Sequence, residues 1–339
     1  MVKKKKQRRK RRRLKPIPKL ILWLLILFCL FYWIIPNVYH YVENTFLSEE
    51  GQANQDAKKI TGNTILSQPE TELSVVDIQS ESAILIDLDT KQPVYKKNAT
   101  QLQYPASLTK IMTVYVAIKN GINWEETVTL PKEAFANVYE EHASVAGFTP
   151  GETCTLSDLL YGTILPSGAD AAQALAIAVA GSEEEFVKQM NETAAELHME
   201  HTNFCNVTGL HEEQQQTTAE DFAILLNAAL KLPEFREIFT TQSYTTTQTE
   251  EHPEGIHLTS TLAWFMETYE IDFDLILGGK TGSTKEAGLC LASLLSLDGK
   301  EFICVTLHAP ETEDGQPQHI LDTLAIGQAY LNAIKKSEA

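Results

Sequence analysis

The stretch GLCLASLLSLDGKEFICVTLHAP, residues 288–310, decides the fold class of this chain. It contains two apolar runs of strand length on either side of Asp298-Gly299, a dipeptide that suits a two-residue hairpin turn. A turn of that length fixes the register and places Ser293 opposite Cys304. We therefore expect two long antiparallel strands close to the C-terminus.

Strand character is also found well before this hairpin. SAILIDL (82–88) is an apolar run typical of a strand covered on both faces, and DTKQ turns the chain into PVYKK (93–97) as a second hairpin. SYTTTQT (243–249) has strand composition as well. Strands near both ends of the region indicate that one sheet is assembled from segments distant in sequence.

The segments between these strands are typical of helices. Ser157 is expected to cap the second of them, and Thr217 with Glu220 forms a capping-box pattern at the fifth. The predicted helices are TKIMTVYVAI (109–118), LSDLLYGTIL (156–165), ADAAQALAIAVA (169–180), SEEEFVKQMNETAAELHM (182–199), TTAEDFAILLNAAL (217–230), LPEFREIF (232–239) and HILDTLAIGQAYLNAIKK (319–336). The pattern predicts an α+β domain, in which an antiparallel sheet is flanked by helices and carries an inserted helical subdomain.

Charge is distributed unevenly along the chain. Residues 1–19 hold 12 of the 28 lysines and arginines and none of the 45 acids. The remainder has 16 basic and 45 acidic residues, a net charge of −29, which should repel nucleic acid. We therefore interpret the basic tail as a topology signal rather than a nuclear or RNA-binding signal, and we expect no nucleic-acid partner.

The next segment supports that interpretation. LILWLLILFCLFYWII (20–35) is 16 apolar residues without a charge, and aromatic residues extend it past Pro36. We expect a transmembrane anchor at 20–39, a flexible polar linker at 40–79 and a catalytic domain at 80–339. The N-terminus would be cytoplasmic and the domain extracytoplasmic in a single-pass bacterial membrane protein. No A-x-A-like site follows the apolar run, so we favour an uncleaved anchor; cleavage as a signal peptide is the alternative.

The five cysteines do not form a disulfide or zinc pattern. Ser293 is the residue expected opposite Cys304. Cys290 lies three residues before Ser293, so its side chain should point to the other face of the strand from that of Ser293. We expect no bond between Cys290 and Cys304. Neither the cysteines nor any other motif indicates a metal or a cofactor.

PASLTK, residues 105–110, is the first segment that indicates chemistry. Ser107 and Lys110 are three residues apart, so on a helix they would share a face, with Cβ atoms roughly 5–6 Å apart. A hydroxyl beside an amine can act as a nucleophile with its base. Alone, the pattern is equally compatible with an ordinary helix start, because serine and proline both favour that position.

Two further motifs occur in a fixed order after the first. LPSGADAA (165–172) places Ser167 ahead of a predicted helix, and GGKTGST (278–284) lies just before a predicted strand. Taken singly, Ser167 could be a helix cap and Lys280-Thr281-Gly282 a solvated turn. Together the three motifs follow the Ser-x-x-Lys, Ser-x-Asn-like and Lys-Thr-Gly order of penicillin-binding proteins and class A β-lactamases.

The surrounding sequence resembles the D-alanyl-D-alanine carboxypeptidase family, the low-molecular-mass penicillin-binding proteins. The resemblance runs from about residue 82 to 308 and rests on AILIDLDTKQPVYKKNA, YPASLTKIMT, GFTPGE, LLYGTILPSGADAA, FVKQMNETAAELHMEHTNFCNVTGLH, TTAEDFAIL and GGKTGSTKEAGLCLAS. It implies a serine-type carboxypeptidase that removes the terminal D-alanine from peptidoglycan stem pentapeptides through an acyl-enzyme. β-Lactams would be covalent inhibitors.

The resemblance also implies roles for individual residues. Ser107 would be the nucleophile and Lys110 its base, with Lys280 as the second cation that lowers the pKa of Lys110. Ser167 would bridge the two lysines and pass a proton to the departing D-alanine.

Substrate contacts are implied for the third motif. Lys280 and Thr281 would hold the terminal carboxylate, and Gly282 would let the substrate backbone lie along the strand. The backbone N–H groups of Ser107 and Ser283 would hold the oxyanion.

One departure from the family pattern concerns the second motif. Its third residue is Ala169 where the pattern has asparagine, and a lost buried polar contact costs about 1–3 kcal/mol, so we expect altered specificity or slower acylation. Two other functions stay open: a class A-like β-lactamase, although no ExxLN-like loop lies between the second and third motifs, and a non-catalytic module that binds penicillin or peptidoglycan.

Overall fold

The computed structural model describes residues 76–136, 138, 143–272 and 274–338. All of them belong to one compact unit that spans residues 70–339. The predicted basic tail at 1–19, the anchor at 20–39 and most of the linker at 40–79 lie outside the described residues. In the described part of the chain, no helix is both long and apolar enough to cross a membrane.

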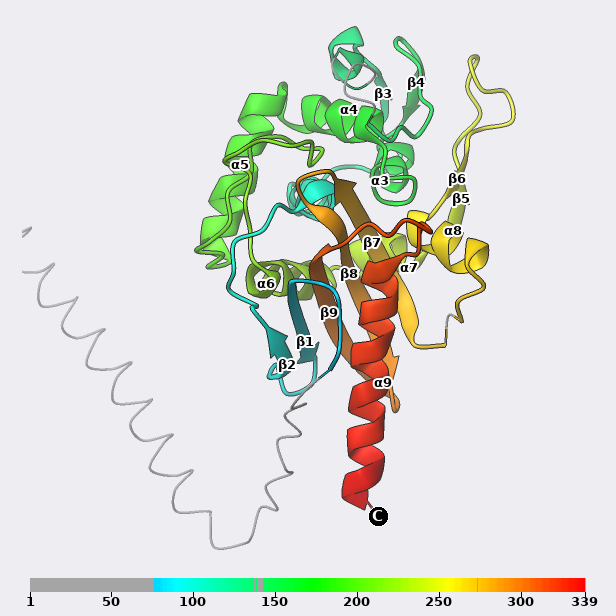
Figure 1. Cartoon of the computed structure of the whole chain (residues 1–339). Helices are drawn as coiled ribbons and strands as arrows, with labels where there is room; N and C mark the ends of the chain where they lie inside the picture. The colour runs from blue at the N-terminus through cyan, green and yellow to red at the C-terminus, as the bar shows by residue number, and fades with distance from the viewer. Residues whose placement is uncertain (1–75, 137, 139–142, 273, 339) are drawn as a thin grey trace, which may run out of the picture. The chain divides into compact units, whose positions relative to one another are not determined.

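As the sequence predicts, strands of the main sheet lie near both ends of the described chain, and most of the helices lie between them (Figure 1). The described strands are β1 (Ser82–Asp87), β2 (Pro93–Lys97), β3 (Thr127–Thr129), β4 (Thr153–Thr155), β5 (Ser243–Thr245), β6 (His257–Thr259), β7 (Ile276–Thr284), β8 (Gly288–Leu297) and β9 (Lys300–Ala309). The described helices are η1 (Ala106–Leu108), α2 (Thr109–Lys119), η2 (Lys132–Phe135), α3 (Leu156–Ile164), α4 (Ala169–Ala180), α5 (Glu183–Glu196), α6 (Ala219–Ala229), α7 (Pro233–Thr240), α8 (Thr261–Thr268) and α9 (Gln318–Glu338).

The main sheet has five strands in the order β2-β1-β9-β8-β7, and all neighbours are antiparallel. The predicted hairpin register is confirmed, because Ser293 pairs with Cys304. A register shift between Leu289 and Leu291 then displaces Cys290, whose thiol is free, as expected. The topology leaves β7 at one edge of the sheet, a position that matters for the site.

Side chains along β9 alternate between the two faces of the sheet, and the core is divided into two layers accordingly. Ile303, Val305 and Leu307 belong to a large cluster with the helices between β2 and β7, whereas Phe302 and Cys304 belong to a smaller cluster that includes α9 residues. Successive strand residues point to opposite faces, so the sheet is covered on both sides. Figure 1 shows α9 running along the sheet. The expected α+β architecture with an inserted helical section is therefore confirmed for this unit.

The predicted helix caps are wrong by one or two residues. Thr155, not Ser157, caps α3, and it forms the capping box with Asp158. Thr218, not Thr217, caps α6 and accepts a hydrogen bond from the N–H of Asp221. In both cases a threonine one or two residues away has extended backbone geometry and takes the role, and composition does not separate the two candidates.

The start of the domain is fixed to α9 by one buried carboxylate. Asp322 is 2% exposed. It accepts the Ser80 N–H at 2.6 Å and the Ser80 hydroxyl at 2.5 Å, and it accepts the Gln79 N–H at 3.1 Å. These contacts join segments about 240 residues apart. Their loss would leave several buried donors unpaired.

We expect Asp322→Ala to lower the free energy of unfolding by about 2–4 kcal/mol, because unpaired buried donors each cost about 1–3 kcal/mol. Asp314→Ala removes an exposed carboxylate of the preceding loop and should change stability by less than about 0.5 kcal/mol. Urea unfolding followed by circular dichroism measures both. Equal unfolding midpoints for the two variants would contradict the role given to Asp322.

Candidate active site

Ser107 and Lys110 meet at the junction of two helical segments. Ser107 lies in η1 and Lys110 in the first turn of α2, and Lys110 Nζ is 3.1 Å from Ser107 Oγ. The alternative that Ser107 simply caps the helix is wrong, since the N-cap of α2 is Leu108 and no side chain caps it. Proximity of the two groups follows from their spacing of three residues.

Two glycines lie so close to the backbone around Ser107 that a side chain at either position would crowd it. A Cβ on Gly209 would lie 1.9 Å from the carbonyl oxygen of Ala106, and a Cβ on Gly282 would lie 3.0 Å from the amide nitrogen of Ser107. Ala106 itself has a φ of 46°, which is unfavourable for a residue with a side chain. The turn at 206–209 and strand β7 therefore both pack directly against the backbone at Ser107.

Lys110 is buried at 2% exposure. Its ammonium donates to the carbonyl oxygen of Thr208 at 2.5 Å, and Thr113, one turn later, donates to the carbonyl of Val207 at 2.8 Å. Burial lowers the pKa of Lys110 from 10.5 to about 7, and the charge of Asp170 opposes this by raising it. A large fraction of Lys110 is therefore neutral near neutral pH and able to accept a proton.

Lys280 enters the same region from the middle of β7. It is 0% exposed and its Nζ donates to the carbonyl oxygen of Thr281 at 2.7 Å. Burial lowers the pKa of Lys280 well below its ordinary value, and the charge of Lys110 lowers it further. Lys280 was expected to contribute to the lowered pKa of Lys110. In the structure burial is the cause that lowers it.

Ser167 has an unsatisfied hydroxyl. Its Oγ is buried without a hydrogen-bond partner among the described residues, and its φ is 63°. The expected bridge from Ser167 to the two lysines is therefore not formed, and neither is a helix cap, because Gly168 is the N-cap of α4. Ala169 is fully buried, and its N–H donates to the carbonyl of Ser144 at 2.8 Å.

The Lys280-Thr281-Gly282 motif is part of a strand rather than a segment before one, and it is not a solvated turn. It lies within β7, at the free edge of the sheet, where Thr281 pairs with Leu291. Ser283 follows, and its exposed hydroxyl lies 3.4 Å from Glu311 Oε1. Gly282 lies beside the amide of Ser107, so the segment that carries Ser283 is next to η1.

Two other polar side chains have partners outside this group. Arg236 forms an ion pair with Glu301. His211 packs edge-on against Tyr104 with ring centroids 4.8 Å apart, which suits a structural role. Among the described residues no group of three or more His, Cys, Asp or Glu side chains could hold a metal ion.

The comparison with protein families decides the classification. Residues 66–311 match the model of the peptidase S11 family, described as D-alanyl-D-alanine carboxypeptidase. The chain belongs to this family. The resemblance noted from the sequence motifs is thus confirmed.

Individual relatives agree with the family model. D-alanyl-D-alanine carboxypeptidase DacF of Bacillus subtilis (strain 168) is 33% identical over 257 residues, covering 72% of this chain and 61% of the relative. DacD of Escherichia coli (strain K12) is 31% identical over 267 residues, covering 76% of this chain and 66% of the relative. The chain thus spans a little under two thirds of the length of these curated relatives.

Solved structures give the same result for the fold. The crystal structure of the Streptomyces K15 DD-transpeptidase has a TM-score of 0.66 at 27% identity, and the match covers 75% of this chain and 97% of that one. The D-alanyl-D-alanine carboxypeptidase family and this chain therefore share the fold that carries the three motifs.

Sequence reasoning missed the structural role of Asp170. This buried carboxylate in the first turn of α4 accepts the N–H groups of Ala146 at 2.7 Å, Gly147 at 3.0 Å and Phe148 at 3.1 Å. It thereby holds the 146–148 segment against the Ser167 loop. Asp170 and the GFTPGE segment both lie in stretches that resemble the family. The sequence does not indicate that the Asp170 carboxylate accepts hydrogen bonds from the backbone of that segment.

We expect Asp170→Asn to lower the pKa of Lys110 further below about 7, because it removes the negative charge that favours the ammonium form. The ¹³C chemical shift of labelled lysine ε-carbons, followed between pH 5 and 11, reports this titration. Asp89→Asn, at an exposed site, is the matched control. A midpoint that stays fixed or rises in Asp170→Asn would contradict the electrostatic link.

Proposed function

We propose that this protein is a serine-type D-Ala-D-Ala carboxypeptidase that removes the terminal D-alanine from peptidoglycan stem peptides. One observation carries the proposal: the Ser107 hydroxyl lies 3.1 Å from a buried amine whose pKa is lowered to about 7. Such an amine is a suitable base for a serine nucleophile. Membership in the carboxypeptidase family supports the choice of substrate.

The chemistry begins with a proton transfer. Neutral Lys110 keeps one N–H on the Thr208 carbonyl, which leaves its lone pair free to accept the Ser107 proton. The Ser107 oxygen attacks the carbonyl between the two D-alanines, and the oxyanion is stabilised by the backbone N–H groups of Ser107 and Ser283. Ser167, whose hydroxyl has no partner among the described residues, would relay the proton from Lys110 to the departing D-alanine amine once substrate is bound. Water then hydrolyses the Ser107 ester.

The free edge of β7 supplies a second part of the proposed site. A substrate in extended conformation adds to this edge like another strand, which the absent side chain of Gly282 permits. Lys280 and Thr281 would hold the terminal carboxylate. Lys280 is fully buried, so its influence on the carboxylate acts mainly through the local field.

The two alternatives have weaker support. A β-lactamase requires rapid hydrolysis of the penicilloyl ester, and class A enzymes use a glutamate-activated water for that step. No ExxLN-like motif lies between Ser167 and Lys280 in the sequence. A non-catalytic binding module is compatible with Ala169, but it would not require a buried, easily deprotonated lysine beside a serine.

Covalent labelling separates these functions. We expect fluorescent penicillin to label the wild-type protein and Ser107→Ala to abolish labelling, because the acyl bond forms at the Ser107 oxygen. Release of D-alanine from a peptide ending in D-Ala-D-Ala is measured in parallel, and Ser157→Ala is the control for a serine outside the site. Rapid turnover of penicillin would favour the lactamase. A wild-type protein that neither labels nor releases D-alanine would favour the binding module.

We also propose that residues 20–39 anchor the protein in the cell membrane, with 1–19 cytoplasmic and residues 80–339 extracytoplasmic. The support is the uncharged apolar run directly after twelve positive charges. The full-length chain should remain in the membrane fraction after a carbonate wash, and a chain lacking residues 1–39 should be soluble. Recovery of the full-length chain in the soluble fraction, or of a product shortened at the N-terminus, would contradict the uncleaved anchor.

A further inference from the structure

Thr261, the first residue of α8, lies against the Lys-Thr-Gly strand although no motif marks it. Its hydroxyl oxygen is 2.7 Å from the hydroxyl oxygen of Thr281, which is the best distance for an O–H···O hydrogen bond. The sequence pattern does not predict a helix at 261–268, so this contact could not be anticipated from the sequence.

Both hydroxyls are attached to backbone that is fixed from several sides. The N–H of Thr261 donates to the carbonyl of Leu165 at 2.9 Å, and the preceding N–H of Ser260 donates to Gln242 at 2.8 Å. Thr281 is held by its pairing with Leu291 in the sheet. Leu165 lies two residues before Ser167, so Thr261 connects the Ser167 loop to β7.

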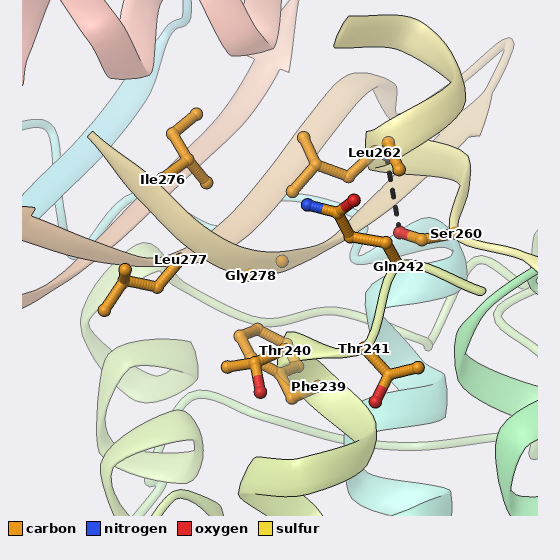
Figure 2. A pocket seen from close by; sticks show the side chains of 11 residues that line it. Phe239, Thr240, Thr241, Gln242, Ser260, Leu262, Ile276, Leu277 and Gly278 are labelled. Carbon is orange, nitrogen blue, oxygen red and sulfur yellow. Dashed lines mark hydrogen bonds between the residues drawn. The ribbon is translucent and has the colours of Figure 1, made fainter. Parts of the chain in front are cut away.

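Figure 2 shows how closely the start of α8 approaches the edge strand. A small hollow there is lined by the end of α7, by Ser260 and Leu262 of the α8 start, and by Gly278 and neighbouring residues of β7. A Cβ on Gly279 would lie 2.9 Å from a methyl carbon of Leu262. This packing leaves the first turn of α8 little freedom to move relative to Thr281.

Other groups that commonly bind a carboxylate are engaged elsewhere. Arg236 is the single arginine in the described part of the chain, and it pairs with Glu301. Lys280 is fully buried, and its ammonium already donates to the Thr281 carbonyl. A bidentate arginine contact, the usual strong partner of a carboxylate, is therefore not supplied by the described residues.

We infer that Thr261 is a positioning residue for recognition of the substrate's terminal carboxylate; this inference rests on the function proposed above. A threonine hydroxyl has one proton and two acceptor sites. The hydrogen bond between the two hydroxyls can run in either direction. In the substrate complex that we infer, Thr261 donates its proton to the Thr281 oxygen, so the Thr281 proton is directed to the carboxylate. Hydrogen bonds arranged in such a chain strengthen one another, and a bond to a charged acceptor is worth more than a neutral one.

The test compares Thr261→Val with Thr261→Ser and Thr259→Val in the full-length chain purified in detergent. Thr261→Val should raise KM for a D-Ala-D-Ala peptide roughly tenfold and change kcat less than about twofold, since only binding of the carboxylate is weakened. Thr261→Ser, which retains the hydroxyl, should stay within about twofold of wild type. Thr259→Val removes a nearby hydroxyl that makes no hydrogen bond to a described residue and should have no effect.

A double-mutant cycle separates positioning from a structural role. If Thr261 acts through Thr281, then Thr261→Val should add little to the KM of Thr281→Val. Three results would overturn the inference. They are a multiplicative effect on KM in the double variant, an unchanged or lower KM in Thr261→Val, and a Thr261→Ser variant as impaired as Thr261→Val. Thermal unfolding identifies a variant that is merely destabilised. If Thr261→Val is destabilised, the Thr261→Ser comparison and the double-mutant cycle decide whether Thr261 acts through Thr281.

The rate of acylation by penicillin, which also carries a carboxylate, gives an independent readout. Thr261→Val should slow it roughly tenfold at subsaturating penicillin. If the wild-type protein is acylated but releases no D-alanine, the proposed carboxypeptidase activity fails while the acylation rates still test Thr261. If Thr261→Val is acylated at the wild-type rate, the inference about Thr261 fails by itself.

Discussion

The rest of the structure depends on the burial of a lysine amine next to a serine hydroxyl. Water would keep Lys110 protonated, and a protonated lysine cannot take a proton from serine. The protein removes that water by packing the 206–209 turn and β7 against η1, and it gives the amine a single strong acceptor in the Thr208 carbonyl. Removing an amine from water costs free energy, so this packing must be stabilised by the two hydrophobic layers around the sheet.

Strand β7 combines the alternation of any strand with a position at the edge of the sheet. Alternation sends Lys280 towards the buried serine and lysine, and it sends Thr281 towards α8, where Thr261 lies. A central strand would alternate in the same way, but neighbouring strands would occupy both of its edges. At an edge, the same backbone retains free hydrogen-bonding groups for an extended peptide.

Much of this arrangement is predictable from local patterns, whereas the contacts between segments are not. The Asp298-Gly299 turn predicted the register of the β8–β9 hairpin, and periodicity predicted the α-helices other than α8, since those signals act within a few residues. The caps of α3 and α6 were misplaced because a second serine or threonine one or two residues away is an equally suitable cap by composition. The local pattern did not predict strand β7, because its glycines are also typical of a turn. Their role becomes clear only when the segments that pack closely against them are known. The Asp170 and Thr261 contacts join residues 20 or more apart, and only the folded chain brings such groups together.

Several unfavourable features of this protein lie at the proposed site, while others lie elsewhere in the described chain. At the site, Ala106 and Ser167 have positive φ angles, the Ser167 hydroxyl is buried without a partner among the described residues, and Lys280 is buried close enough to Lys110 for the charge of Lys110 to lower its pKa. Each costs on the order of 1–3 kcal/mol, and none is needed to close the sheet or to cover it. A module that only binds peptide would gain stability by replacing any of them with an apolar or relaxed residue. Their retention around one serine is therefore better explained by a reaction that uses a strained hydroxyl and a neutral amine than by binding alone. Ala169, which stands where the family pattern has asparagine, leaves the contact between Ser107 and Lys110 in place.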